Sequence, residues 1–286
     1  MTAPMMDLSM RMTTYASAFV RHLSQIGNVH LLTGMKGNLG DHLIWTGTEQ
    51  LLAAQGVDVT TLEAADLGAD ARAGCLVVPG SGAFTRRFHE WLPHTVERAA
   101  AIFDEVIIAP SEFHPDVPVV HRALSLPNVV AMARDAHSYR AITRFGRADL
   151  GLDLALHHPD FDPSLKPKYD GDGPTLVAMR TDHGSALHDH GLAVHPHANR
   201  DIAVEADTLD HYLDVIRGAA NIVTDRLHVV VAAVMTGTRV TFVDPNDRKI
   251  SRYVSFTFRD QADHLVQHVS FATLLEQGFV VPAGAS

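Results

Sequence analysis

An arginine and a histidine stand at the start of the most apolar helix that the sequence predicts. The residues Thr224 to His228 follow an apolar strand and lead into the run 229–235, which is entirely apolar. Such a helix must be largely buried, so charged groups at its start are costly unless they meet partners or a ligand. A helix start also offers free N–H groups and partial positive charge. The sequence therefore predicts an anion-binding site at the helix that begins around Asp225.

Two features of this segment leave alternatives open. Thr224 or Asp225 can cap the helix. Arg226 and His228 lie two positions apart and would not share a face of a regular helix. Both can reach one ligand only if Arg226 sits in the turn itself. The alternative interpretation is an Asp225–Arg226 pair beside a core histidine.

Three further cations occupy comparable places. Arg134 ends one predicted strand, Arg180 follows another in the second half, and Lys249 closes a turn after a third. An arginine offers a planar fork suited to carboxylate or phosphate. The alternatives are a surface pair of Arg134 with Asp135, which is worth little, a pair of the same kind at Arg180 with Asp182, and a solvated turn at Lys249.

Two glycine-rich turns also follow predicted strands. The first, 33–42, contains Asn38 and Asp41, and the second, 79–84, contains Gly80 and Ser81. Glycine allows the backbone to approach a ligand closely. The first turn is neither a Walker loop nor a good dinucleotide fingerprint. The alternative is an ordinary turn in each case, with Asp41 capping the next helix.

The histidines do not predict a metal site. The chain has 19, and five gather in one segment: His183, His188, His190, His195 and His197. A zinc site needs three or four ligands in a defined geometry. The spacing fits no such pattern and the segment lacks cysteine, so we expect a surface cluster and no metal.

The elements that must position these residues alternate along the chain. Strands are expected at 28–33, 74–79, 105–109, 128–133, 175–179, 202–205, 221–224 and 239–243, with helices at 41–55 and 209–218. Strand and helix alternating at this spacing predict crossover units and parallel sheets. In such sheets ligands lie beyond the carboxyl ends of the strands. The predicted fold is α/β, with two Rossmann-like domains whose parallel sheets face a central cleft.

The domain boundary is expected in the segment 158–174, which is crowded with Pro, Asp and Gly and has no periodicity. The expected domains are 1–162 and 163–286. The segment 260–277 is predicted to be helical and to pack back on the first domain.

Composition restricts the function classes. The chain has 286 residues and a formal net charge of -10, which argues against a general nucleic-acid binder. The single cysteine, Cys75, lies in an apolar run and is expected to be buried without chemistry. The start of the chain lacks the features of a signal peptide. We therefore expect a cytoplasmic protein. Arg86, Arg87 and Phe88 with Trp91 could touch a membrane, and an ordinary helix face is the alternative.

Together these segments resemble the polysaccharide pyruvyl transferase family. The matching words occur in the family's order over about residues 30 to 255, and the Thr-Asp-Arg-Leu-His word is the most specific. They are Gly37-Asn38-Leu39-Gly40-Asp41, Arg134-Asp135 with Ser138, Met179-Arg180-Thr181-Asp182, and Thr224-Asp225-Arg226-Leu227-His228 with Lys249. The sequence departs from the family at His42 and in its compact second glycine loop.

The resemblance implies a GT-B-like fold and an enzyme that transfers pyruvate from phosphoenolpyruvate to two hydroxyls of a sugar, without a cofactor. The acceptor would be a lipid-linked polysaccharide unit, for example an undecaprenyl-linked oligosaccharide, at the inner face of the membrane. The implied roles fall into three groups: His228, Arg226 and Asp41 in catalysis; Arg134, Arg180, Arg226, Lys249 and Thr224 at the donor; Asn38, Asp41, Gly80 and Ser81 at the acceptor.

Other function classes compete with this interpretation. A nucleotide-sugar glycosyltransferase would use the same glycine loops and helix start for a diphosphate. A non-catalytic phosphosugar-binding protein would bind an anion without releasing phosphate. A metal hydrolase would use the histidine segment.

Overall fold

The computed structural model describes residues 6–68, 72–168, 173–194 and 199–283. The chain divides into two compact units. Unit 1 comprises Met1–Gly37 and Ile44–Pro159, and unit 2 comprises Asn38–Leu43 and Asp160–Ser286. The helix α2, Leu39–Ala54, is therefore divided: its residues up to Leu43 group with unit 2, and its residues from Ile44 onward group with unit 1.

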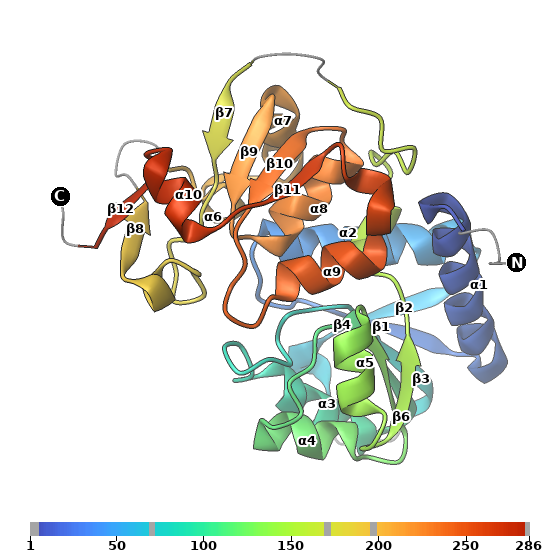
Figure 1. Cartoon of the computed structure of the whole chain (residues 1–286). Coiled ribbons are helices and arrows are strands. Elements are labelled where there is room, and N and C mark those ends of the chain that lie inside the picture. The colour runs from blue at the N-terminus through green and yellow to red at the C-terminus, as the bar shows by residue number, and fades with distance from the viewer. Residues whose placement is uncertain (1–5, 69–71, 169–172, 195–198, 284–286) are drawn as a thin grey trace, which may run out of the picture. The chain divides into compact units, whose positions relative to one another are not determined.

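Unit 1 is built on a six-stranded sheet in the order β2-β1-β3-β4-β5-β6, and every pair in it is parallel (Figure 1). The central strands are buried along most of their length, as expected for strands covered on both faces. The strands are β1 Val29–Thr33, β2 Val59–Glu63, β3 Arg72–Val78, β4 Phe103–Ser111, β5 Val129–Ala133 and β6 Arg147–Leu150.

The helices of unit 1 connect and cover these strands. The first begins at Asp7, whose side chain accepts a hydrogen bond from the Met10 N–H, and ends at Gly27, whose φ of 68° suits glycine. The helices are α1 Leu8–Ile26, α2 Leu39–Ala54, α3 Leu92–Ala100, α4 Pro118–Leu124 and α5 Ala136–Ile142, with short 3-10 turns η1 Ala64–Asp66 and η2 Leu154–His157.

Unit 2 has a four-stranded parallel sheet in the order β11-β10-β9-β7 and an antiparallel pair β12-β8. The strands are β7 Thr175–Val177, β8 Leu192–Val194, β9 Asn221–Thr224, β10 Arg239–Phe242, β11 Val266–His268 and β12 Val280–Pro282. The helices are α6 Ile202–Glu205, α7 Leu209–Gly218, α8 Leu227–Met235, α9 Lys249–Thr257 and α10 Phe271–Glu276, with 3-10 turns η3 His188–His190 and η4 Arg259–Ala262.

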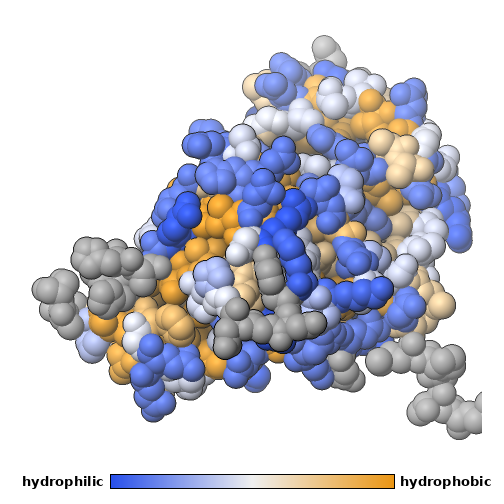
Figure 2. All heavy atoms as spheres, turned by 90° about the horizontal axis from the view of Figure 1, so that it is seen from above, coloured by the Kyte–Doolittle hydropathy of each residue, from blue (hydrophilic) through white to orange (hydrophobic). Residues whose placement is uncertain are grey.

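A small apolar cluster joins the antiparallel pair to the sheet of unit 2. Val177, Val223 and Val280 are among its buried members, and Leu192 and Phe271 among those that are only partly buried. Orange side chains gather on the left of Figure 2, the side on which β8, β12 and α10 lie in Figure 1. This end of unit 2 therefore shows part of its apolar cluster at the surface.

The predicted fold class is confirmed: the chain is mixed α/β with two parallel sheets, consistent with a Rossmann-like, GT-B-like architecture. Seven of the eight expected strands lie within a residue or two of observed ones. The strand predicted at 202–205 is wrong, because these residues form α6. The Glu205 carboxylate accepts a hydrogen bond from the Asp201 N–H, which closes a helical turn that four residues of apolar pattern could not reveal.

The helix predicted over 260–277 is also wrong for most of its length. Val266–His268 forms β11, which pairs in parallel with β10 and so belongs to the sheet of unit 2. Only Phe271–Glu276 is α-helical, and the Ser270 side chain caps it by accepting a hydrogen bond from the Thr273 N–H. Pairing of 266–268 with β10 therefore outweighs the local helical pattern in this segment.

Among the helices that the structure describes, none combines the length and apolar character that crossing a bilayer requires.

Cys75 lies fully buried in β3, as predicted. Burial, and then the charge of Glu105, raises the pKa of its thiol to about 11. Because only the thiolate reacts readily, we expect a thiol reagent at pH 8 to leave the native protein unmodified and to label one thiol after denaturation. Rapid labelling of the native protein would contradict this burial.

Candidate functional site

The start of α8 is the centre of the candidate site. Arg226 precedes the helix in an extended conformation, with φ -100° and ψ 121°, so it lies in the turn and not on the helix. Within α8 every residue is buried except His228, which is partly exposed. The turn conformation meets the condition under which Arg226 and His228 can serve one ligand.

Asp225 and Thr224 anchor this turn to the neighbouring strand end. The Asp225 carboxylate is fully buried and accepts hydrogen bonds from Arg180 N (2.7 Å), Ala186 N (2.9 Å) and Ser185 Oγ (3.0 Å). Thr224 Oγ1 donates to the Ala178 carbonyl at 2.7 Å and accepts from the Arg226 N–H at 3.0 Å. Asp225 therefore holds the loop after β7 and is not the cap of α8.

Arg226 pairs with Asp201 and not with Asp225. Its Nε lies 2.6 Å from Asp201 Oδ1 and its Nη2 lies 2.5 Å from Oδ2, and both side chains are buried. Burial alone would lower the pKa of Arg226, but the hydrogen bonds and charge of Asp201 outweigh it and raise that pKa. The expected alternative, an Asp225–Arg226 pair, is not what the structure shows.

Arg180 carries a second, similar pair. Its Nε and Nη2 donate to the two carboxylate oxygens of Asp182 at 2.9 and 2.8 Å. Asp182 Oδ2 also lies 3.5 Å from Arg226 Nη2, so this carboxylate interacts with both arginines. Burial favours the neutral acid, but Arg180 holds the pKa of Asp182 well below its usual range. The structure thus brings the predicted residues Arg180 and Arg226 to one place.

A cavity of about 320 Å³ opens beside Arg180, at the carboxyl end of β7. The lining residues are Arg180, Thr181, Ser185, Leu187, His188, Leu192, Ala193, Val194, Asn199 and Glu205. A cavity at a strand's carboxyl end, with an arginine in its wall, is the usual place for a ligand in such a sheet.

The start of α2 also belongs to this site. Asn38 Oδ1 accepts from the Gly40 N–H at 2.9 Å, and Asp41 Oδ2 accepts from the Asn38 N–H at 3.0 Å. This reciprocal pattern is a capping box, so the expected alternative role of Asp41 at the helix start is present. A Cβ placed on Gly40 would lie 2.9 Å from His228 Cβ and 3.1 Å from its Nδ1. The structure therefore places the Asn38–Asp41 turn directly against His228.

This contact predicts an unusual effect of Gly40→Ala. Alanine normally stabilises a helix relative to glycine, but here its methyl group would press against the His228 side chain and Asn38 Oδ1, so these groups must shift. We expect a loss of about 1–3 kcal/mol in the free energy of unfolding and a shifted His228 signal in the NMR spectrum. The matched control is Gly218→Ala at the end of α7, where an added Cβ meets nothing within 4 Å. Equal stabilities for the two variants would contradict the contact.

Arg134 in unit 1 is buried between two carboxylates. Its Nη1 donates to Asp153 Oδ2 at 3.0 Å and its Nη2 lies 3.6 Å from Glu112 Oε2. Asp135, the partner expected for it, instead caps α5 by accepting from the His137 and Ser138 N–H groups. The alternative of a surface pair between Arg134 and Asp135 is therefore wrong.

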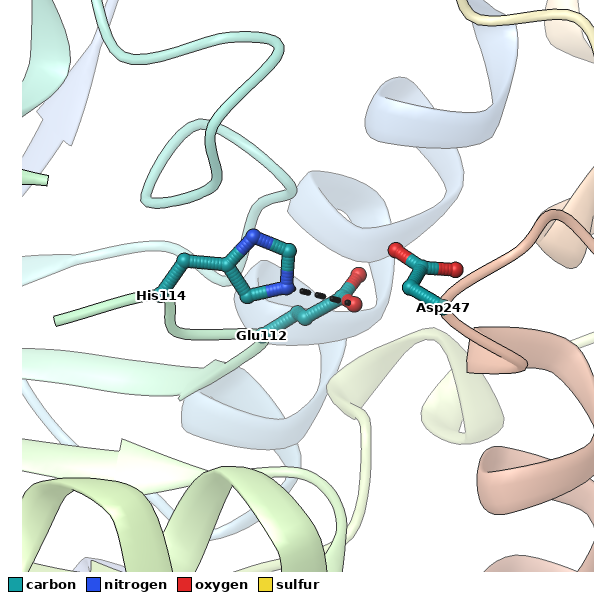
Figure 3. A group of neighbouring side chains, drawn as sticks. All are labelled: Glu112, His114 and Asp247. Carbon is teal, nitrogen blue, oxygen red and sulfur yellow. Dashed lines mark ion pairs between the residues drawn. The ribbon is translucent and has the colours of Figure 1, made fainter. Parts of the chain in front are cut away.

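Glu112 also interacts with a histidine that the sequence did not single out. Figure 3 shows the His114 ring turned toward the Glu112 carboxylate, with Nε2 3.5 Å from Oε1. The His114 Nδ1 accepts from the Arg86 N–H at 3.2 Å, and its Nε2 is the nitrogen that faces Glu112. Asp247, also labelled in Figure 3, belongs to unit 2 and accepts from the Lys249 N–H.

The second glycine turn has a clear packing role. A Cβ on Gly80 would lie 2.5 Å from the Pro110 carbonyl oxygen, so the turn after β3 approaches β4 too closely there for any side chain. Ser81 Oγ accepts from the Ala83 N–H, and Ser81 N donates to Ser111 Oγ.

Lys249, in unit 2, is the first residue of α9. That helix is capped by Asp244, which accepts from the Ile250 N–H at 2.9 Å.

The remaining expectations concern the surface. His183, His188 and His190 are exposed, while His195 and His197 lie outside the described residues. Within the described part of the chain, none of the three groups with two further ligand atoms at coordinating distance.

In unit 1, Arg86 is exposed and pairs with Asp116 at 2.7 Å.

Asp201 is the main residue that the sequence analysis missed. Asp201 directly precedes the predicted strand 202–205, so it does not follow the carboxyl end of any predicted strand, where ligand-binding residues are expected. Its partner is 25 positions away. The only local signal was an aspartate followed four residues later by a glutamate.

Comparisons with known proteins identify the fold and the family of the chain. No curated protein shows significant similarity to the chain. A solved structure of a functionally uncharacterized Klebsiella pneumoniae protein is similar in fold, with a TM-score of 0.71 at 16% identity, covering 91% of this chain and 98% of that one. The family model for polysaccharide pyruvyl transferase matches residues 38–247, which is most of the chain and contains Asn38, Arg180 and Arg226. The chain belongs to the polysaccharide pyruvyl transferase family.

Proposed function

We propose that the protein transfers pyruvate from phosphoenolpyruvate to two hydroxyls of a sugar and forms a pyruvate ketal. The observation that carries this proposal is the junction of β9 and α8. There, a buried and charge-paired arginine in the turn stands next to a partly exposed histidine at an uncapped helix start. Phosphoenolpyruvate carries both a phosphate and a carboxylate, and arginine forks bind both groups.

The reaction needs one proton delivered to carbon and two removed from oxygen. Protonation of the enol CH₂ carbon gives a methyl group, and one sugar hydroxyl attacks the central carbon. Phosphate then leaves with its bonding electrons and takes up one of the two hydroxyl protons, and the second hydroxyl attacks the same carbon. The sugar gains pyruvate less one water, and the donor's phosphate is released. No electron donor or acceptor is consumed.

The positions of the side chains support the roles that we propose. His228 acts as the acid and base, because it is the partly exposed side chain of α8 and an imidazole can both give and take a proton. Arg226 and Arg180 hold the donor, with the helix start supplying N–H groups. Thr224 fixes the turn through its bonds to Ala178 and Arg226.

The other residues have supporting roles in this proposal. Arg134 and Lys249 contribute positive charge. Asn38, Gly80 and Ser81 contact the acceptor, and Asp41 takes a proton from its hydroxyl. The scheme uses no metal or cofactor. The proposed acceptor is a lipid-linked polysaccharide unit, which would place the enzyme in the cytoplasm at the membrane surface.

Thermal unfolding with different donors tests the proposal. A ligand at about 100 times its dissociation constant stabilises a protein by roughly 2.7 kcal/mol. We expect millimolar phosphoenolpyruvate to raise the midpoint in the wild type and not in Arg226→Ala. A rise with UDP- or GDP-sugars and none with phosphoenolpyruvate would instead identify a glycosyltransferase.

A further inference from the structure

The two edges of the Arg226 guanidinium have different surroundings. The side edge, formed by Nε and Nη2, is taken by the two carboxylate oxygens of Asp201 at 2.6 and 2.5 Å. A guanidinium has a second edge, formed by Nη1 and Nη2, that can hold a carboxylate or phosphate in the same forked manner. We infer that Asp201 is a positioning residue, which anchors the side edge of Arg226 so that the end edge receives the donor anion. This inference rests on the proposed function.

Asp201 is itself held rigidly. It is 1% exposed, and its Oδ2 accepts from Thr181 N at 3.0 Å and from Thr181 Oγ1 at 3.1 Å. Its own N–H donates to Glu205 Oε1 at 2.8 Å. The Asp201 carboxylate is thus bound to the loop after β7, and its backbone is bound to the first turn of α6. These bonds fix the position of the carboxylate independently of Arg226.

The surroundings of the pair strengthen it. The fully buried Tyr212 of α7 lies close to both Arg226 and Asp201. Water is excluded from this side of the pair, so the hydrogen bonds between the two charges are stronger than at a surface. The guanidinium is therefore fixed before a ligand arrives, and less conformational entropy is lost on binding.

Asp182 behaves differently from Asp201. Its side chain is 37% exposed and approaches Arg226 Nη2 only to 3.5 Å. An anion that binds the end edge of Arg226 competes with this carboxylate and not with Asp201. Asp201 is thus the buried anchor of Arg226, and Asp182 is a partner that the bound anion can replace.

A purely structural role for Asp201 would give different results. If it only connected α6 to α8, its loss would lower stability and leave the affinity of the folded protein for phosphoenolpyruvate unchanged. If it positions Arg226, its loss lowers that affinity, and the effect disappears when Arg226 is absent, because the two changes act through one interaction.

The test is a double-mutant cycle on the full-length protein, read by calorimetric titration of phosphoenolpyruvate. We expect Asp201→Asn to weaken binding about tenfold or more, and to add nothing to the loss in Arg226→Ala. The matched control is Asp210→Asn, which changes an exposed aspartate of α7 and should bind as the wild type does. Wild-type affinity in a folded Asp201→Asn protein would overturn the inference and leave the proposed function intact.

A second measurement needs only the wild-type fold. In the ¹⁵N spectrum, with the Arg226 signals assigned by Arg226→Lys, phosphoenolpyruvate should shift the Nη signals and leave the Nε signal nearly in place. A large Nε shift would show that the ligand displaces Asp201 and would overturn the inference even if Asp201→Asn does not fold. Failure of the wild type to bind phosphoenolpyruvate at all would overturn the proposed function and this inference together.

Discussion

Asp225→Ala is expected to lower the free energy of unfolding by about 3–5 kcal/mol, the usual cost of breaking a buried charged network. The carboxylate accepts from Arg180 N, Ala186 N and Ser185 Oγ, and it has no exposed surface. Removing it leaves three buried donors without their acceptor, and each unsatisfied donor carries a desolvation cost. The measurement is equilibrium unfolding in urea.

The matched control is Asp214→Ala in α7. The Asp214 side chain is exposed and lies 3.4 Å from Arg217, a surface pair worth little. We expect a change within about 0.5 kcal/mol there. If Asp225→Ala cost no more than Asp214→Ala, then Asp225 would not hold the loop after β7, and its place in the family word would need a different explanation.

His228→Ala is expected to lower turnover by about 10²- to 10⁴-fold, the usual contribution of a general acid or base. The fold should survive, because His228 is the partly exposed member of an otherwise buried helix. Affinity for phosphoenolpyruvate should fall much less than turnover, since the paired arginines remain. The measurements are phosphate release with acceptor present and calorimetric titration of the donor.

The control for this variant is His211→Ala, which removes an exposed histidine from α7 of the same unit. It should retain wild-type turnover. Undiminished turnover in His228→Ala would remove this residue from the mechanism. A parallel loss of donor affinity and turnover would instead assign His228 to donor binding.

The β9–α8 junction could be predicted because its signals are local. An apolar strand, a polar turn and a fully apolar helix follow one another in about fifteen residues, and burial alone makes the charges there noteworthy. The sequence could also state the condition for Arg226 to act, namely that it lies in the turn, and the structure meets that condition.

The partners of these charges could not be predicted, because they come from elsewhere in the chain. Asp225 was expected to cap its own helix or to pair with Arg226, yet its donors lie about 40 positions away. Arg226 meets Asp201, and Arg134 meets Asp153 instead of the adjacent Asp135. Local patterns identify a buried charge, but only the packing of the sheet selects the group that neutralises it.

A mixed-donor assay tests the central claim most directly. The wild-type protein would be given phosphoenolpyruvate and UDP- and GDP-sugars together, with a panel of lipid-linked and free oligosaccharides, and products would be followed by phosphate release and mass spectrometry. Pyruvyl transfer predicts that phosphoenolpyruvate is consumed while the nucleotide sugars persist, and that one acceptor gains the mass of pyruvate less water. Consumption of a nucleotide sugar with phosphoenolpyruvate left intact would contradict it.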